Sequence, residues 1–176
     1  MNEKKLHKGR GAISNPASRF DPYESEPVDD GWDEVESTRL SSSAPKTRFF
    51  PDQTRNIITT NKSPDIPFDR SINPYKGCEH GCVYCYARPT HAFLGLSPGL
   101  DFETQIFYKT EPAARLVEAL ERRGYKVRPI AMGTNTDPYQ PGERQLSITR
   151  EILKTLLKYR HPVTLVTKST LILRDL

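Results

Sequence analysis

The cysteines of this 176-residue chain are concentrated in one short loop. Cys78, Cys82 and Cys85 follow the spacing Cys-x3-Cys-x2-Cys, and Gly77 and Gly81 precede the first two. Glycine permits a positive φ and a close approach of the backbone to a bulky group. Iron–sulfur clusters are held by cysteine thiolates, usually four, so three thiolates would leave one iron of a [4Fe–4S] cluster open. An open metal position is typical of a catalytic site rather than a structural one.

Two other interpretations of the cysteines were weighed against the cluster. A structural zinc site normally has four ligands, so His80 or His91 would have to complete a Cys3His set. A disulfide framework favours an even number of cysteines in an oxidising compartment, whereas the basic start of this chain is not followed by an apolar signal segment. We therefore favour an iron–sulfur cluster and keep two alternatives, a non-catalytic zinc or iron–sulfur binding module and an inactive truncated fragment.

The cysteine loop resembles the motif of the radical S-adenosylmethionine (radical SAM) superfamily, with Tyr84 at the aromatic position before the third cysteine. A wider set of segments resembles one subgroup, the spore photoproduct lyase-like or DNA repair photolyase-like proteins. Those segments are residues 63–68, 73–75, 88–91 and 133–139. The resemblance covers residues 57–176, and a weaker similarity extends back to residues 9–12.

This resemblance implies a cofactor and a reaction. It implies that Cys78, Cys82 and Cys85 bind a [4Fe–4S] cluster that reductively cleaves S-adenosyl-L-methionine to a 5′-deoxyadenosyl radical. An electron donor of the flavodoxin or ferredoxin type and a damaged-DNA substrate follow from the same resemblance. Tyr84 would pack near the adenine or the cluster edge, and Lys168 would reach the SAM carboxylate. The hydrogen-returning cysteine of such lyases has no counterpart here, because no cysteine follows Cys85.

Polar residues also follow two of the expected strands. The segment 133–142 comes directly after the apolar run 127–132, and Asn135 and Asp137 are its best candidates for ligand binding. Asn and Asp often bond their own backbone in a rigid turn, but ligands bind at the carboxyl ends of strands in α/β folds. We favour the ligand-binding interpretation for this segment. Lys168 follows another apolar run, residues 163–167, and is either solvated or a ligand contact.

The rest of the domain shows an alternation of strand and helix signals. Strands are expected at residues 71–75, 102–108, 127–132 and 163–167, with helices capped near Thr110 and Ser147 and a further helix from residue 170. Such alternation favours an α/β fold with a parallel sheet. The fold implied by the resemblance is a partial (β/α)6 radical SAM barrel, with about four β/α units in residues 57–176 and the C-terminal part missing.

Residues 1–56 differ in composition from the rest of the chain. A basic start is followed by a run of Asp and Glu without Lys or Arg, and such blocks resist compaction. We expect a disordered or loosely docked arm, or a segment that docks through Trp32 and Phe49–Phe50. A net charge of +4 permits a nucleic-acid partner without requiring one. No apolar stretch is long enough to span a membrane, so a cytoplasmic protein is expected.

Overall fold

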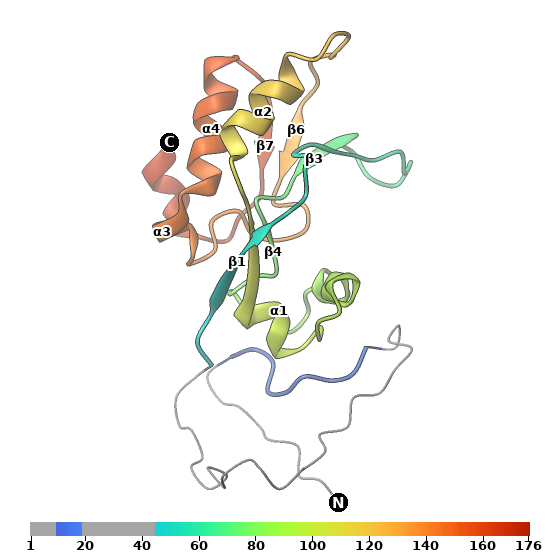
Figure 1. Ribbon diagram of the computed structural model, residues 1–176, viewed down its shortest axis with the longest axis vertical. Coiled ribbons are helices and arrows are strands. Elements are labelled where there is room, and N and C mark those ends of the chain that lie inside the picture. The colour runs from blue at the N-terminus through green and yellow to red at the C-terminus, as the bar shows by residue number, and fades with distance from the viewer. Residues whose placement is uncertain (1–9, 19–44) are drawn as a thin grey trace, which may run out of the picture.

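Residues 10–18 and 45–176 are described by the computed structural model, which has a mixed α/β fold with two sheets (Figure 1). The larger sheet has the strand order β2-β3-β6-β7. β3, β6 and the edge strand β7 run parallel, and β2 pairs with β3 in the antiparallel sense. The strands are β2 Thr59–Thr60, β3 Arg70–Ile72, β6 Ile130–Met132 and β7 Val163–Leu165.

The smaller sheet has the order β1-β5-β4. It consists of β1 Arg48–Asp52, β5 Gln105–Lys109 and β4 Tyr75–Lys76. β1 runs parallel to β5 along its whole length, whereas β4 is antiparallel to β5. The chain therefore leaves the larger sheet after β3 and enters the smaller one at β4, immediately before the cysteine loop.

Two amphipathic helices, α2 Pro112–Leu120 and α4 Ile148–Lys158, pack side by side against the larger sheet (Figure 1). Their apolar faces meet the strands in one core, where Leu116, Ile152, Ile130 and Met132 are fully buried. Shorter helical turns complete the chain: η1 Arg88–Leu94, α1 Leu100–Thr104, α3 Glu143–Leu146 and η2 Thr170–Asp175. Periodic apolar residues thus place both helices as the sequence predicts.

The helix starts differ from the sequence prediction. α2 begins after Glu111, which has a left-handed backbone with φ of 50°, so the expected Thr110 cap is wrong. Ser147 does precede α4, but its side chain makes no capping hydrogen bond. The buried carboxylate of Glu143 accepts hydrogen bonds from the Thr149 and Arg150 amides instead. Glu143, which lies in the preceding helix α3 rather than at the cap position, therefore satisfies free N–H groups in the first turn of α4.

Two of the expected strands are also placed differently. The strand expected at 71–75 ends at Ile72, and Pro74 cannot donate a ladder hydrogen bond; its carbonyl accepts one from Lys109 instead. The strand expected at 102–108 begins only at Gln105, because residues 100–104 are helical. It joins the smaller sheet, so the four expected strands do not form one parallel sheet. The described residues close no barrel.

The ordered domain begins earlier in the chain than residue 57. β1 belongs to the smaller sheet, and Asp52 at its end is buried between Lys109 and Lys76, at 2.8 and 3.0 Å. Burial opposes ionisation of Asp52, but the two lysines and Thr54 outweigh it and hold its pKa well below the usual range. Residues 45–56, which the sequence assigns to a disordered or loosely docked arm, thus include a paired strand, with Phe49 against the core and the Phe50 ring 5.3 Å from that of Phe107. Trp32 lies outside the described residues.

Within residues 10–18 and 45–176, every helix is too short or too polar to cross a lipid bilayer.

Candidate functional site

The cysteine loop begins where β4 ends, and its backbone is tightly packed. The Cys78 amide donates to the Phe102 carbonyl over 2.8 Å. Gly77 has φ of +82°, and a Cβ at this position would lie 2.9 Å from the Phe102 carbonyl oxygen and from the His91 ring. Only glycine combines this conformation with this space. The loop is therefore fixed against α1 and η1 from its first residue.

A segment distant in sequence closes the loop from the other side. The Glu103 side chain is fully buried, and its carboxylate accepts hydrogen bonds from the Gly11 and Ala12 amides over 2.9 and 2.8 Å. It also forms an ion pair with Arg88. Gly11 lies so close to the loop that a Cβ there would meet the Gly81 carbonyl oxygen at 1.8 Å. Residues 10–12 thus form a clamp on the cysteine loop, which we call the N-terminal clamp.

Glu79 attaches the loop to the segment before β1 and to the loop after β6. Its amide donates to the Gln140 side chain, and its carboxylate accepts hydrogen bonds from the Gly142 amide and the Thr47 hydroxyl, both over 2.7 Å. Arg10 in turn donates to Thr47 over 2.8 Å. Each of these polar groups has a partner, so the loop is rigid before any ligand binds.

The three thiols are free and differ in exposure. Cys78 is buried, and this burial raises the pKa of its thiol to about 11, so the group is neutral at pH 7. Cys82 and Cys85 are half-buried and line a cavity of about 330 Å³. The cavity is also lined by residues that follow β6 and β7, namely Gly133, Asn135, Thr136, Asp137, Val166, Thr167 and Lys168.

Lys168 reaches the cysteine loop directly. Its Nζ lies 2.8 Å from Cys82 Sγ, and this hydrogen bond raises the lysine pKa. The side chain that the resemblance assigns to a SAM carboxylate is therefore engaged with a cysteine in this structure.

Asp137 ties the two strand ends together. Its carboxylate accepts hydrogen bonds from the Thr167 hydroxyl over 2.6 Å and from the Tyr139 and Lys168 amides over 2.8 and 3.0 Å. Burial would raise the pKa of Asp137, but these bonds and the neighbouring His80 lower it to about 2. The hydrogen bond from the Tyr139 amide closes a turn on the residue two positions earlier. Such a rigid turn is the alternative to ligand binding that the sequence analysis gives for this segment.

Asn135 and Tyr84 also line the cavity. The Asn135 side-chain amide has no hydrogen-bond partner within the described residues, although its backbone amide donates to Asn73 over 3.2 Å. Tyr84 is 84 % exposed, so most of its side chain is open to solvent beside the cavity. Of the four expected cofactor contacts, these two remain free to meet a ligand.

The two histidines near the cysteines each keep one buried ring nitrogen without a hydrogen-bond partner among the described residues, namely His80 Nε2 and His91 Nδ1. His91 is buried between the rings of Phe102 and Phe107, and its Nε2 donates to the Gln105 carbonyl over 3.0 Å. Burial lowers its pKa, which favours the neutral ring. His80 Nε2 lies 3.3 Å from an Asp137 carboxylate oxygen. Neither ring is placed as a fourth ligand beside the thiols.

Within residues 10–18 and 45–176, no three His, Cys, Asp or Glu side chains converge as ligands of a single metal ion would. Zinc requires its ligands at about 2.0–2.3 Å from one centre. This arrangement therefore lends no support to a preformed Cys3His zinc site.

The groups that hold the loop were missed by sequence reasoning. Glu103, Glu79, Gln140 and Gly11 act across separations of about 60 to 90 residues, and no local pattern marks such contacts. One signal in the sequence did mark the N-terminal clamp, because the weaker similarity to the subgroup at residues 9–12 includes it.

Comparison with known proteins identifies relatives but no family. No protein-family model and no solved structure matches the chain. Uncharacterized proteins of Mycobacterium tuberculosis and Mycobacterium bovis are each 44 % identical over 119 residues, which is 66 % of this chain and 35 % of the relative. An uncharacterized protein of Methanocaldococcus jannaschii is 32 % identical over 105 residues, 60 % of this chain and 37 % of the relative. The chain thus spans about a third of the length of these relatives.

Proposed function

We propose that this chain is a radical SAM protein, in which Cys78, Cys82 and Cys85 hold a [4Fe–4S] cluster and the adjoining cavity receives S-adenosylmethionine. One observation carries the proposal. Two of the three cysteines line a cavity together with Asn135 and Lys168, which come from the ends of two different strands. Ligand sites of α/β folds lie at the carboxyl ends of strands.

The donor set fits a cluster better than a single ion. Each thiolate of a cubane cluster binds a different iron, so the three sulfurs lie at separate corners and need not converge on one point. The support for a cluster is that three free thiols lie within eight residues of one loop, whose glycines lie close to Glu103 and the Phe102 carbonyl. Loading must remove a proton from Cys78, since metal ligation requires the thiolate.

When bound, the cluster would supply one electron to the sulfonium of SAM, whose C–S bond breaks to methionine and a 5′-deoxyadenosyl radical. The chain's own residues would bind the ligand and orient it in the cavity. The Lys168 ammonium hydrogen-bonds Cys82 Sγ and lines the same cavity, where it would serve as a point charge for a ligand carboxylate. The free amide of Asn135 offers a donor and an acceptor to the polar part of the ligand. Asp137 holds both strand ends in place.

The finer fold proposal is a partial (β/α)6 barrel. Its support is the parallel set β3, β6 and β7, against which α2 and α4 pack. The polar loops that follow β6 and β7 lie at the carboxyl ends of these strands. β5 is not part of this set. The chain spans about a third of the length of its relatives, so a complete barrel is a proposal for those longer proteins.

A nucleic-acid substrate and a flavodoxin- or ferredoxin-type electron donor complete the proposal. Tyr84, Tyr86 and Phe93 expose 75–88 % of their surface near the cysteine loop. Exposed rings stack with unpaired bases, which supports a single-stranded or extruded base as the substrate of this site.

The test is anaerobic SAM cleavage by reconstituted, dithionite-reduced protein. We expect 5′-deoxyadenosine from the wild-type chain and none from Cys82→Ala, with product retained in Val83→Ala, a control at an exposed neighbour. A wild-type protein that carries its cluster but forms no 5′-deoxyadenosine would contradict the activity of this chain. Product that persists in Cys82→Ala would contradict the assignment of the ligands.

A further inference from the structure

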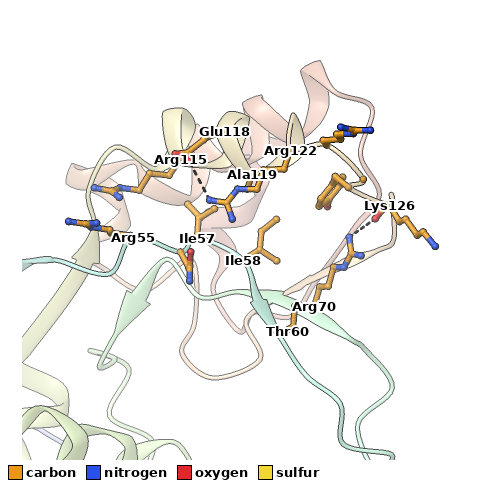
Figure 2. Close-up of a pocket in the computed structure, with 14 residues that line it drawn as sticks. Arg55, Ile57, Ile58, Thr60, Arg70, Arg115, Glu118, Ala119, Arg122 and Lys126 are labelled. Atoms are coloured by element: carbon orange, nitrogen blue, oxygen red, sulfur yellow. Dashed lines mark hydrogen bonds and ion pairs between the residues drawn. The ribbon is translucent and has the colours of Figure 1, made fainter.

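A second cavity, of about 410 Å³, lies between the strands β2 and β3 and the C-terminal end of α2. It shares no residue with the cavity beside the cysteines. Figure 2 shows basic side chains around it, with Arg55 at one end and Lys126 at the other. Six cations and one carboxylate line it: Arg55, Arg70, Arg115, Arg122, Arg123, Lys126 and Glu118. We call this site the arginine pocket.

Three of these cations are already engaged. Arg122 pairs with Glu118 over 3.2 Å, the one carboxylate of the pocket. Arg115 pairs with Glu111 over 3.5 Å and donates to the Thr110 carbonyl over 3.1 Å. Arg70 donates to the Lys126 carbonyl, and its guanidinium lies 4.9 Å from the centre of the Tyr125 ring. The carbonyl and ring contacts of Arg70 orient its guanidinium group without neutralising it.

The other cations have no counter-charge. Arg55, Arg123 and the Lys126 ammonium are exposed and form no ion pair within residues 10–18 and 45–176. The pocket therefore carries several positive charges in excess of its single carboxylate. Such a concentration of positive potential attracts anions.

The floor of the pocket is apolar. Ile57 is 2 % exposed, and Ile58 and Ala119 are half-buried beside it (Figure 2). A rim of guanidinium groups above an apolar floor suits a ligand with one charged and one apolar part. The volume lies within the range of about 300–1,000 Å³ that is usual for small-molecule sites.

The helix end alone does not account for the arrangement. α2 ends at Leu120, and cations that follow a helix are stabilised by the negative end of its dipole. That effect explains Arg122 and Arg123. It does not explain Arg55 or Arg70, which come from other segments and face the same volume.

We propose that the arginine pocket binds a compact phosphorylated small molecule, a nucleoside di- or triphosphate. Guanidinium groups bind phosphate oxygens in pairs, and several of them favour more than one phosphate. Cations from three segments line a single open cavity here, whereas a nucleic-acid strand needs a groove that follows its backbone. The apolar floor receives the nucleoside.

Titration calorimetry of the full chain, without cluster or SAM, tests this site independently of the proposed radical chemistry. The ligands are ATP, ADP, adenosine and a single-stranded oligothymidylate. We expect ADP and ATP to bind at least tenfold more tightly than adenosine, with affinity that falls as salt rises. Arg55→Gln and Arg123→Gln should each weaken ADP binding about tenfold, through the loss of one charge-assisted hydrogen bond.

Arg144→Gln is the matched control, because Arg144 is exposed, lies outside the pocket and forms no ion pair within the described residues. It should change ADP binding less than about twofold. Equal affinity for adenosine and ADP, or an equal loss in Arg144→Gln, would overturn the proposal. So would the absence of binding at millimolar ADP, and so would tighter binding of the oligothymidylate through the same arginines.

Discussion

The cysteine loop and the arginine pocket use charge in opposite ways. Around the loop, the carboxylates of Glu103 and Glu79 are each matched by amides, hydroxyls or an arginine within hydrogen-bond distance. Around the pocket, exposed cations such as Arg55 and Arg123 have no partner in the described part of the chain. Paired and buried charges fix a backbone, whereas unpaired and exposed charges remain available to a ligand. The difference predicts that the first set determines stability and the second set determines binding.

The largest expected effect on stability is that of Glu103→Gln. The exchange removes the negative charge opposite Arg88 and places an NH2 group where two backbone amides donate. Breaking a buried ion pair on one side typically costs about 3 kcal/mol or more. Urea unfolding should show a loss of this size, and Glu111→Gln, at an exposed i,i+4 pair, should change the free energy of unfolding by less than about 0.5 kcal/mol. Equal losses in both variants would break the comparison.

Gly11→Ala tests the N-terminal clamp with one added methyl group. The new Cβ would approach the Gly81 carbonyl oxygen to 1.8 Å, so the clamp or the loop must move. Overpacking of this kind costs roughly 1–3 kcal/mol. Opening of the loop should also speed alkylation of the buried Cys78 by iodoacetamide about tenfold, since exposure requires a local opening.

Mass spectrometry of the alkylated protein gives the rate for each cysteine separately. Ala17→Ser, at an exposed position of the same segment, should leave the alkylation rate of Cys78 unchanged. An unchanged Cys78 rate in Gly11→Ala would show that residues 10–12 do not restrain the loop.

Acid should weaken the tie that Asp137 makes between the two strand ends. Its pKa of about 2 lies below the usual value near 3.9, so its contribution is complete above about pH 4 and is lost as the pH falls through 2. After allowance for solvent screening, we expect this contribution to be about 1 kcal/mol. Between pH 5 and pH 2, the free energy of unfolding should therefore fall by about 1 kcal/mol less in Asp137→Asn than in the wild-type protein. Parallel pH profiles of the two proteins would contradict the assignment.

The smallest expected effect is on the stability of the arginine-pocket variants. Arg55→Gln and Arg123→Gln remove exposed cations without partners in the described residues, so the free energy of unfolding should change by less than about 0.5 kcal/mol. Urea unfolding of each variant beside the wild type measures this. A loss above 1 kcal/mol would assign these arginines to the fold rather than to a ligand.

Local patterns in the sequence were sufficient for some elements. The apolar period that places Ile148, Ile152 and Leu156 on one face predicts α4, and the β-branched runs predict β6 and β7 near their observed positions. Each of these patterns depends on residues within about ten positions of one another. The mixed α/β class follows from their alternation.

Other features depend on contacts that no local pattern contains. β1 exists because β5 offers it a parallel edge, and α1 replaces the start of an expected strand where Glu103 is held by residues 11 and 12. The sequence directs attention to Cys82, Asn135 and Lys168, which the fold brings to one cavity. It does not reveal that Lys168 contacts Cys82, because that pairing depends on where β7 ends relative to the loop.

The most direct test of the central claim is the iron and sulfide content of the chain after anaerobic reconstitution. We expect a brown protein with about four irons and four sulfides per chain. Cys82→Ala and Cys85→Ala should each lose most of this content, and Val83→Ala should retain it. A colourless protein with one bound zinc, or cysteine variants that hold as much iron as the wild type, would contradict the assignment of the cysteine loop as a cluster site.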